Sequence, residues 1–551
     1  MDSINSLGSV SRLGQSLHSR LQEELQEDPT HAQRIVSTDT PVSESATTTT
    51  LTSSARSSGE AKAPQTYSHL ETSLSSDQLN LADLRGSLGQ LQSLVGEATS
   101  FKGTYRVEAG PGQLAAVPSI DGAADSGELF SLMVTTADGD RIEIEIGKTQ
   151  GTEGSLSGGD LYTYSETSVT FKVDGELDSG ELEALAKLTD RLAGLGDNYR
   201  SEGWLQVGGL EAFDHSELTS FKLDVLGVGS DSFSLQYDVD SVSGQRSLLS
   251  DLNGYQYDIS VDMDGFKLDK NFAENSQYQQ YRQIIRDTAH SYRQGEDAGG
   301  VSSSKSSVFF LQGMDALFQV KYDETTEVDS TDTKEADEKS EVDSALAGMT
   351  ASNQQLLDNF SSGLPDFVAA FDSPEFRPNE DQRSEVSTMS LDMAQITTVT
   401  RSRDAEHTYT NVNQRSEYQS RVSQHLGLGA DSVEHANLDS KSNGGQSYLY
   451  RTDIKSASVD RSLNFQDENK LMSIDEIRNQ QHIQKDKVVV EGGLDSNIIR
   501  DLSSPTKNVD THFQIANTES EKRQAQGYLS DYRVIEQLDE LVDGNKVELF
   551  I

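Results

Sequence analysis

Hydrophobic and polar positions alternate most regularly between residues 128 and 146. In the run ELFSLMVTTADGDRIEIEI, alternating apolar residues lie on both sides of Asp138-Gly139. A period of two is typical of a half-buried strand. Asp-Gly between two such runs favours a tight hairpin turn, because glycine tolerates a positive φ. The pattern therefore predicts an antiparallel hairpin at this point of the chain.

Further strand patterns follow, and one helical pattern lies among them. The strand patterns are DLYTYSETSVTFKVDG, LTSFKLDVLGV, SFSLQYDV and YQYDISVDM. The helical pattern places Leu182, Leu185, Leu188 and Leu192 three or four residues apart, which puts them on one face of a helix. The fold class predicted from these elements is α+β: an antiparallel, hairpin-rich sheet with packed helices, flanked by disordered or helical segments.

The chain divides into five segments by composition and periodicity. Residues 1–100 are rich in Ser and Thr and are expected to be disordered or weakly helical. Residues 101–270 form the predicted α+β domain, and residues 271–322 a helical segment. Residues 323–345 hold ten acidic residues against two lysines and are predicted to be a solvated linker. Residues 346–551 form a more polar, mixed α/β region.

The C-terminal region has fewer clear patterns. Strands are expected near residues 386–400 and 447–464, where apolar residues recur at short intervals. A final helix is expected to carry Tyr528, Tyr532 and Ile535 on one face.

The charge of the chain limits its partners. Lys and Arg number 45 against 91 Asp and Glu, which gives a net charge of -46. Such a chain repels phosphate backbones and anionic lipid, so nucleic-acid binding and a peripheral membrane role are not expected. No stretch approaches the ~20 apolar residues that span a bilayer, so membrane insertion is not expected either. We expect a protein partner with basic patches; the oligomeric state stays open. The absence of cysteine excludes disulfides and thiolate metal ligands.

The ends of the chain bear on its location. The segment MDSINSLGSVSRLGQSL has neither a basic start nor a continuous apolar run, so it does not match a secretory signal peptide. We expect the protein to be cytoplasmic, or exported without an N-terminal signal peptide. The terminal KVELFI looks like the tail that some bacterial type I exporters read, and a simple strand end predicts the same residues.

The segment FKVDGELDSGELEAL, residues 171–185, has the spacing of part of a calcium loop. Asp174, Asp178 and Glu181 fall where an EF-hand places its oxygen ligands, and they are the candidate metal ligands of this chain. Lys172 stands where a further anionic ligand is needed. A capping box explains the same residues without a metal, with Asp178 as N-cap and Glu181 three residues later. The sequence favours the capping box over calcium binding.

The same stretch carries a resemblance to a known family. The strings FSLMVTTADGDRIEIEI, FKVDGELDSGELEALAKL and LTSFKLDV resemble a family of uncharacterised acidic proteobacterial proteins. These proteins share a hairpin ending in an Asp-Gly-Asp turn and a helix that starts with an acid, Leu and Asp. The resemblance covers residues 128–226 and implies a bacterial protein, with no activity or site residue attached to it.

No catalytic constellation stands out in the sequence. FDHSEL places Asp214, His215 and Ser216 in a row, but the members of a triad are brought together by the fold and not by adjacency in sequence. No H-x-H or H-E-x-x-H pair and no G-x-S-x-G turn occurs. We therefore assign no catalytic and no cofactor-binding residue, and expect a non-enzymatic, acidic interaction or accessory protein. The alternative is a carboxylate-based hydrolase or a calcium-binding module in residues 101–270.

Overall fold

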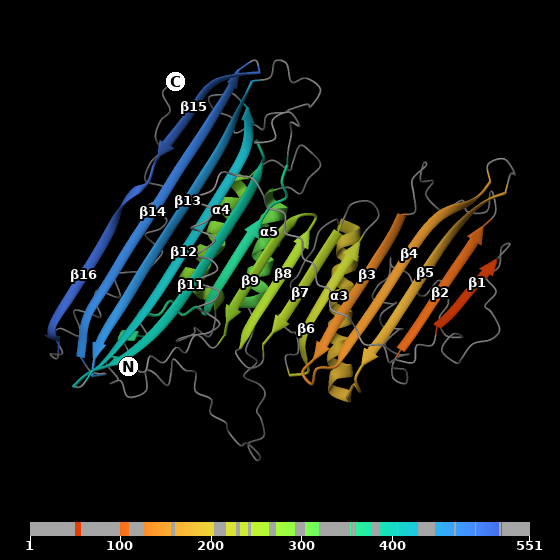
Figure 1. The fold of residues 1–551 in the computed structure, drawn as a ribbon, viewed down its shortest axis with the longest axis horizontal. Helices are drawn as coiled ribbons and strands as arrows, with labels where there is room; N and C mark the ends of the chain where they lie inside the picture. The colour runs from red at the N-terminus through yellow and green to blue at the C-terminus, as the bar shows by residue number, and fades with distance from the viewer. Residues whose placement is uncertain are drawn as a thin grey trace, which may run out of the picture. The chain divides into compact units, whose positions relative to one another are not determined.

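The predicted fold class is wrong in its balance of elements. A computed structural model of the chain describes residues 50–56, 100–109, 126–155, 160–202, 216–226, 232–240, 244–263, 272–292, 303–318, 353, 356–357, 360–376, 385–404, 406–427, 447–467, 470–490, 492–516 and 520. These residues are mostly antiparallel β-sheet, with 64% in strands, 21% in helices, and only three α-helices among them. The chain therefore has a sheet-dominated fold and not an α+β fold built on packed helices (Figure 1).

The described residues divide into two compact units. The N-terminal unit comprises the described residues of Gln33–Val242 and Ser247–Asn253, and the C-terminal unit those of Ser243–Arg246 and Gly254–Ile551. The predicted linker 323–345 and the predicted final helix with Tyr528 lie outside the described residues.

The N-terminal unit is a sheet with strand order β1-β2-β5-β4-β3-β6-β7-β8. β1 pairs with β2 in parallel, and the pairs from β2 to β7 are antiparallel. One helix contacts β6. The elements are β1 (Thr50–Arg56), β2 (Ser100–Ala109), β3 (Ser126–Thr136), β4 (Arg141–Ser155), β5 (Asp160–Asp174), α3 (Ser179–Glu202), β6 (Leu218–Leu226), β7 (Ser232–Val239) and β8 (Gln245–Leu252).

The β3–β4 hairpin forms where the alternation predicts it. Gly139 has a φ of 95°, and the Thr136 backbone N–H donates to Asp140 O at 2.9 Å. Every second side chain in residues 130–136 and 142–146 is buried, because successive residues of a strand point to opposite faces. Phe130 and Ile146 lie opposite each other in this buried row, both at 0% exposure.

The C-terminal unit is an antiparallel sheet with strand order β9-β10-β11-β12-β13-β14-β15, and β16 pairs with β14 beside β15. Its central strands have 16 to 21 residues, far above the usual five or six. The elements are β9 (Tyr255–Asp262), η3 (Phe272–Glu274), α4 (Ser276–Ser291), α5 (Ser303–Phe318), β10 (Asp366–Asp372), β11 (Thr388–Arg403), β12 (Thr408–Gly427), β13 (Tyr448–Gln466), β14 (Lys470–Val490), β15 (Gly493–Asp501) and β16 (Ser504–Ala516).

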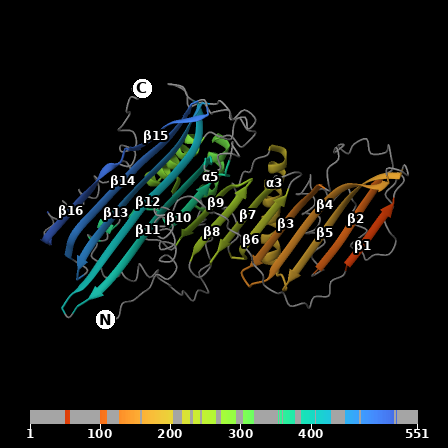
Figure 2. The same ribbon diagram turned by 45° about the horizontal axis from the view of Figure 1, so that its top comes forward.

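The helices α4 and α5 lie against one face of the strands from β9 to β12, as both ribbon views show (Figures 1 and 2). Aromatic rings fill this interface. Tyr257 of β9 lies 4.7 Å from Phe309 of α5 between ring centroids, and Tyr281 of α4 lies 4.9 Å edge-on from Phe367 of β10. Such tilted and edge-on pairs stabilise the fold by more than the burial of their surface area alone. These aromatic contacts hold α4 and α5 against this face of the sheet.

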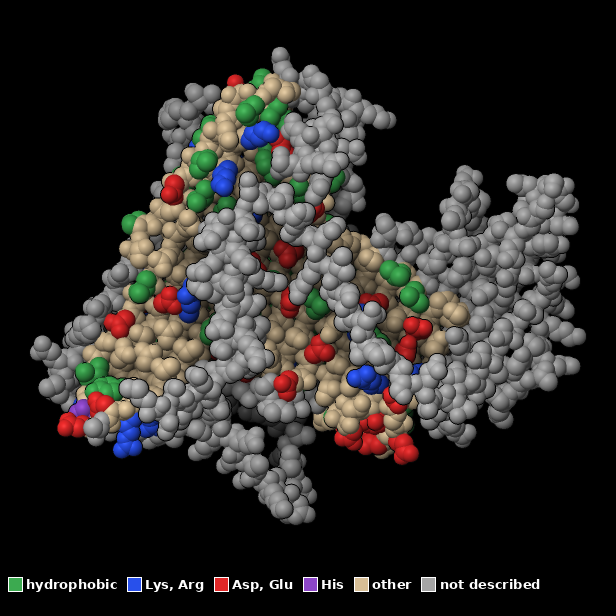
Figure 3. Space-filling model, viewed as in Figure 1, with side chains coloured by type: hydrophobic (Ala, Val, Ile, Leu, Met, Phe, Trp, Pro, Cys, Tyr) green, Lys and Arg blue, Asp and Glu red, His purple; other side chains and the backbone are tan. Residues whose placement is uncertain are grey.

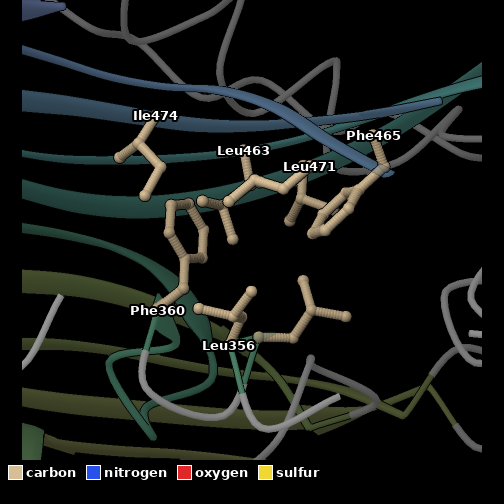
Figure 4. Packing of buried hydrophobic residues seen from close by; sticks show 8 residues of the cluster. Leu356, Phe360, Leu463, Phe465, Leu471 and Ile474 are labelled. Atoms are coloured by element: carbon tan, nitrogen blue, oxygen red, sulfur yellow. The ribbon is translucent and has the colours of Figure 1, made fainter. Parts of the chain in front are cut away.

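Farther along the strands, the same sheet carries a second apolar cluster. Figure 4 shows Phe360 and Leu356 facing side chains of β13 and β14, among them Leu463 and Ile474. All of the cluster is buried, at 8% exposure or less. The segment around residues 356–360 therefore covers the sheet at this point.

Replacing Leu463 tests how much of the stability depends on this cluster. Leu463→Ala is expected to lower the free energy of unfolding by about 2–5 kcal/mol, because the lost side chain leaves a cavity in a closed cluster. The matched control is Ile477→Ala on β14, where the side chain is 43% exposed; we expect a loss of about 0.5 kcal/mol. Urea unfolding curves measure both, and equal losses would contradict the packing described.

Candidate functional site

The candidate calcium ligands lie where β5 ends and α3 begins. Asp178 Oδ1 accepts hydrogen bonds from the backbone N–H of Gly180 at 2.7 Å and of Glu181 at 2.9 Å. Glu181 Oε2 accepts the Asp178 N–H at 2.9 Å. This is the reciprocal capping box that the spacing predicts. Two of the three candidate carboxylates therefore satisfy backbone N–H groups of the first helical turn.

Asp174 lies at the end of β5, opposite Arg141 in the register. Within the described ranges, no group of three or more His, Asp or Glu side chains is placed to hold a metal ion. Calcium binding by Asp174, Asp178 and Glu181 stays a prediction, to be tested by titration.

A denser cluster of reactive side chain types lies on the C-terminal unit, and no motif in the sequence indicated it. His425 lies on β12. Its Nδ1 is 3.1 Å from Ser387 Oγ, and its Nε2 is 3.2 Å from Glu385 Oε2. Tyr448 of β13 donates to the same Glu385 oxygen at 2.9 Å, and Lys487 of β14 pairs with the other oxygen. Side chains from three adjacent strands thus converge on one carboxylate.

The protonation of this cluster follows from its partners. Burial alone raises the pKa of Glu385, but hydrogen bonds from His425, Lys487 and Tyr448 outweigh burial and leave this pKa below its ordinary value. An ionised carboxylate only accepts hydrogen bonds, so the hydrogen between His425 and Glu385 is on Nε2 of the histidine. Because the pKa is lowered on folding, the ionised carboxylate stabilises the fold above about pH 4.5, and this contribution is lost as the pH falls through the lowered pKa.

The order hydroxyl, imidazole, carboxylate is that of a serine nucleophile with its base and orienting acid. The surroundings differ from those of an active site. Ser387 and His425 are 0% exposed, whereas a nucleophile has to reach a substrate. The backbone N–H of Ser387 donates to Phe376 O at 2.8 Å, so this N–H is not available to an oxyanion. The geometry supports a structural clamp that ties β12, β13 and β14 to the segment before β11.

A second group of acids lies at a small pocket beside β9 and β10. Asp366 and Asp262 are directly opposite in the register, so both side chains project to the same face of the sheet. The pocket has a volume of about 20 Å³ and also includes Gln245 and Ser260 in its lining. A space of roughly 10–15 Å³ holds a water molecule. The pocket therefore has room for one water and not for an organic substrate.

Burial raises the pKa of Asp366 to about 7, with a further rise from Asp262, while hydrogen bonds from Thr397 oppose it. One of these bonds runs from the Thr397 backbone N–H to Asp366 Oδ2, at 2.7 Å. A neutral carboxylic acid costs less to bury than a carboxylate. Asp366 is therefore half protonated near neutral pH and fully ionised only in alkali.

Exposed hydrophobic side chains gather at the far edge of the C-terminal unit. Among the described residues, 11 large hydrophobic residues are exposed, and four of them lie between residues 490 and 499. Leu494 and Ile499 are the two most exposed of all, at 62% and 67%. We call this group the edge patch; it consists of Val490, Leu494, Ile498 and Ile499. Figure 3 shows hydrophobic side chains along the strip that β15 occupies in Figure 1.

An ion-pair network holds the strand that bears the edge patch. Asp486 of β14 is 3% exposed and receives Arg451 Nε of β13 at 2.8 Å. Arg500 of β15 pairs with the other oxygen of Asp486. A buried carboxylate needs this compensation, since an uncompensated buried charge costs several kcal/mol. The network therefore fixes β15 against β14, and the edge patch lies on an ordered strand.

Comparison of the chain with protein-family models, with curated proteins and with solved structures finds no match. No helix in the described part of the chain is long and apolar enough to cross a membrane. The candidate triad residues Asp214 and His215 lie outside the described residues.

Two substitutions at Asp178 separate capping from calcium binding. Asp178→Ala is expected to lower the free energy of unfolding by about 1 kcal/mol, because it removes the acceptor for two backbone N–H groups, whereas Asp178→Asn keeps that acceptor and changes stability little. Thermal unfolding with and without calcium measures both effects. A calcium-dependent rise in the melting temperature of the wild type that both variants abolish would contradict the capping interpretation.

The raised pKa of Asp366 predicts a pH dependence of stability. Since the folded pKa of about 7 exceeds the ordinary value of 3.8, the protonated acid stabilises the fold at low pH, and this contribution is lost as the pH rises through about 7. Asp366→Asn is expected to gain stability relative to the wild type as the pH rises from 4 to 8. Urea unfolding over this range measures the difference, with the exposed Asp372→Asn as control. A difference that stays constant with pH would contradict the raised pKa.

Proposed function

We propose that this chain is a non-enzymatic protein that acts by binding a protein partner at the edge patch. The observation that carries the proposal is the concentration of exposed apolar side chains on β15, at 62% and 67% exposure for Leu494 and Ile499. Single exposed apolar residues are ordinary, but a contiguous group of them marks an interaction site.

The charge of the chain supports a partner that is cationic. The net charge of -46 makes association of two copies unfavourable and raises the rate of encounter with a basic protein. Asp495 and Asp501 lie on either side of Ile499, so the edge patch itself has an acidic border. An apolar centre with a charged rim is the usual anatomy of a protein interface.

The clamp around Glu385 supports a non-enzymatic role. Its serine and histidine are buried, and its carboxylate is shared among three side-chain donors, an arrangement that holds strands together. The alternatives of a carboxylate-based hydrolase and of a calcium-binding module stay predictions. The pocket at Asp366 offers a hydrolase a water molecule but no room for a substrate.

Site-specific photo-crosslinking tests the proposed function. A benzophenone amino acid replaces Ile499 in the intact chain, and the matched control replaces Ile477, which is 43% exposed on β14. We expect one partner protein to crosslink at position 499 and not at position 477. The purified partner should then bind the wild type about tenfold or more tightly than Ile499→Lys, because a charge replaces an apolar anchor. Equal crosslinking at both positions, or crosslinks only to the chain itself or a second copy, would disprove the proposal.

A further inference from the structure

The edge patch lies on a strand whose outer side has no neighbour among the described residues. Residues 483–490 of β14 pair with β15 and residues 471–480 pair with β16, so β15 and β16 follow one another along the same side of β14. β15 ends the strand order of the sheet. Its outward backbone N–H and C=O groups are therefore placed to pair with an added strand.

The two parts of this outer edge differ in how they are protected. β16 contains Pro505, which has no N–H to donate, and Lys507, and both residue types are common means of blocking edge pairing. β15 contains neither proline nor lysine. A register shift at Asp495 interrupts the first part of β15, so an incoming strand meets a continuous row of donors and acceptors only along residues 496–501.

The two faces of β15 have different chemistry, because successive side chains alternate. Arg500 pairs with Asp486, and Ile498 is opposite Asp486 in the register, so Ile498 and Arg500 share one face. The register shifts at Asp495, between the pairs of Val488 and Val489, so Leu494 lies on the other face with Ile499 and Asp501. One face is apolar with a cation that is already paired, and the other has two apolar side chains and one acid.

We infer that the partner contributes an extended segment that adds to residues 496–501 of β15 as an antiparallel strand, with an apolar residue beside Ile499 and Lys or Arg beside Asp501. This inference rests on the proposed function and names its binding mode and the type of segment. Antiparallel addition continues the pairing of every described strand from β9 to β16. Main-chain hydrogen bonds supply affinity in this mode, and alternating side chains supply specificity.

β15 is suited to this role because it is already ordered. The Asp486 network holds it at Arg500, and beyond its end the Leu502 N–H donates to His482 O at 2.8 Å. Hydrogen bonds from the Ser503 side chain and from the Ser503 backbone N–H, the latter at 3.0 Å, lower the pKa of Asp501 and keep it ionised. A template that is fixed before binding loses less entropy on association. The acid at the end of β15 is therefore in place and charged when a basic residue arrives.

A synthetic peptide tests strand addition with the intact protein. Read antiparallel to β15 from Asp501, the segment Lys-Glu-Val-Leu-Thr-Thr-Lys-Val places its first lysine beside Asp501 and its first valine beside Ile499. We expect this peptide to slow amide hydrogen exchange within residues 493–501. Methylation of its backbone nitrogens that face β15 should weaken binding about tenfold or more, equivalent to about 1.4 kcal/mol, because it removes the ladder donors and leaves the side chains.

The protein variants complete the test. Ile499→Lys should weaken peptide binding by a similar factor, and the control Ile477→Lys should leave it unchanged. Absence of protection at millimolar peptide, or equal binding of the methylated peptide, would overturn strand addition. In that case a partner that still crosslinks at position 499 would leave the proposed function standing with another mode of contact. If the peptide gives no protection and no partner crosslinks at position 499, both the proposed function and strand addition are disproved.

Discussion

The structure of the C-terminal unit depends on one constraint: each strand satisfies half of its backbone hydrogen-bonding groups only through a neighbour. An unpaired buried backbone group costs about as much as a lost hydrogen bond. The strands from β11 to β14 have 16 to 21 residues, so each needs a partner of matching length. The neighbours supply it in unbroken register over most of this length, as between β12 and β13. Among the described residues of this unit, β15 and β16 form the outer edge of the sheet, and β15 carries three of the four residues of the edge patch.

Pairing alone is not enough, because the register of each strand pair also has to be fixed. A slip by one residue turns every side chain of a strand to the wrong face. Side-chain networks across the strands do this in the C-terminal unit. The Glu385 clamp joins three strands to the segment before β11, and the pair of Arg461 with Glu476, at 3.0 Å, joins β13 to β14 where both side chains are buried. Removing one member would leave a buried charge without compensation, which makes a shifted register costly. The buried cluster of Ser387, His425 and Glu385 therefore has a structural explanation. The proposed function rests on the exposed edge patch instead.

Local patterns in the sequence predict local structure in this chain. They do not predict which distant segments pair with one another. The Asp138-Gly139 hairpin and the capping box of Asp178 and Glu181 follow from residues a few positions apart, and the structure contains both. β11 and β13 overlap the strands expected near 386–400 and 447–464. β12 was missed because TYTNVNQRSEYQSRVSQHLG is polar on both faces. Its polar residues pair with polar partners on the adjacent strand, as Asn411 does with Asn464 at 2.6 Å. Glu385 and His425 meet across 40 residues of chain, and no local spacing indicates that contact.

Two of the buried acids of the C-terminal unit, Glu385 and Asp366, have pKa values shifted in opposite directions, and the difference shows what determines a carboxylate's state in this sheet. Glu385 receives hydrogen bonds from three side chains, two of which carry or can carry positive charge, and its pKa is lowered. Asp366 has hydrogen bonds from Thr397 but no cation among the groups that shift it, and a second acid lies opposite, so its pKa is raised. Burial alone disfavours both carboxylates. The chain has twice as many acids as bases, so most carboxylates cannot find a cation within it. Acids without such a partner are stable where water solvates them, where burial keeps them protonated as it does Asp366, or where a basic partner protein supplies the missing charge. We propose that the acidic border of β15 is a place of the last kind.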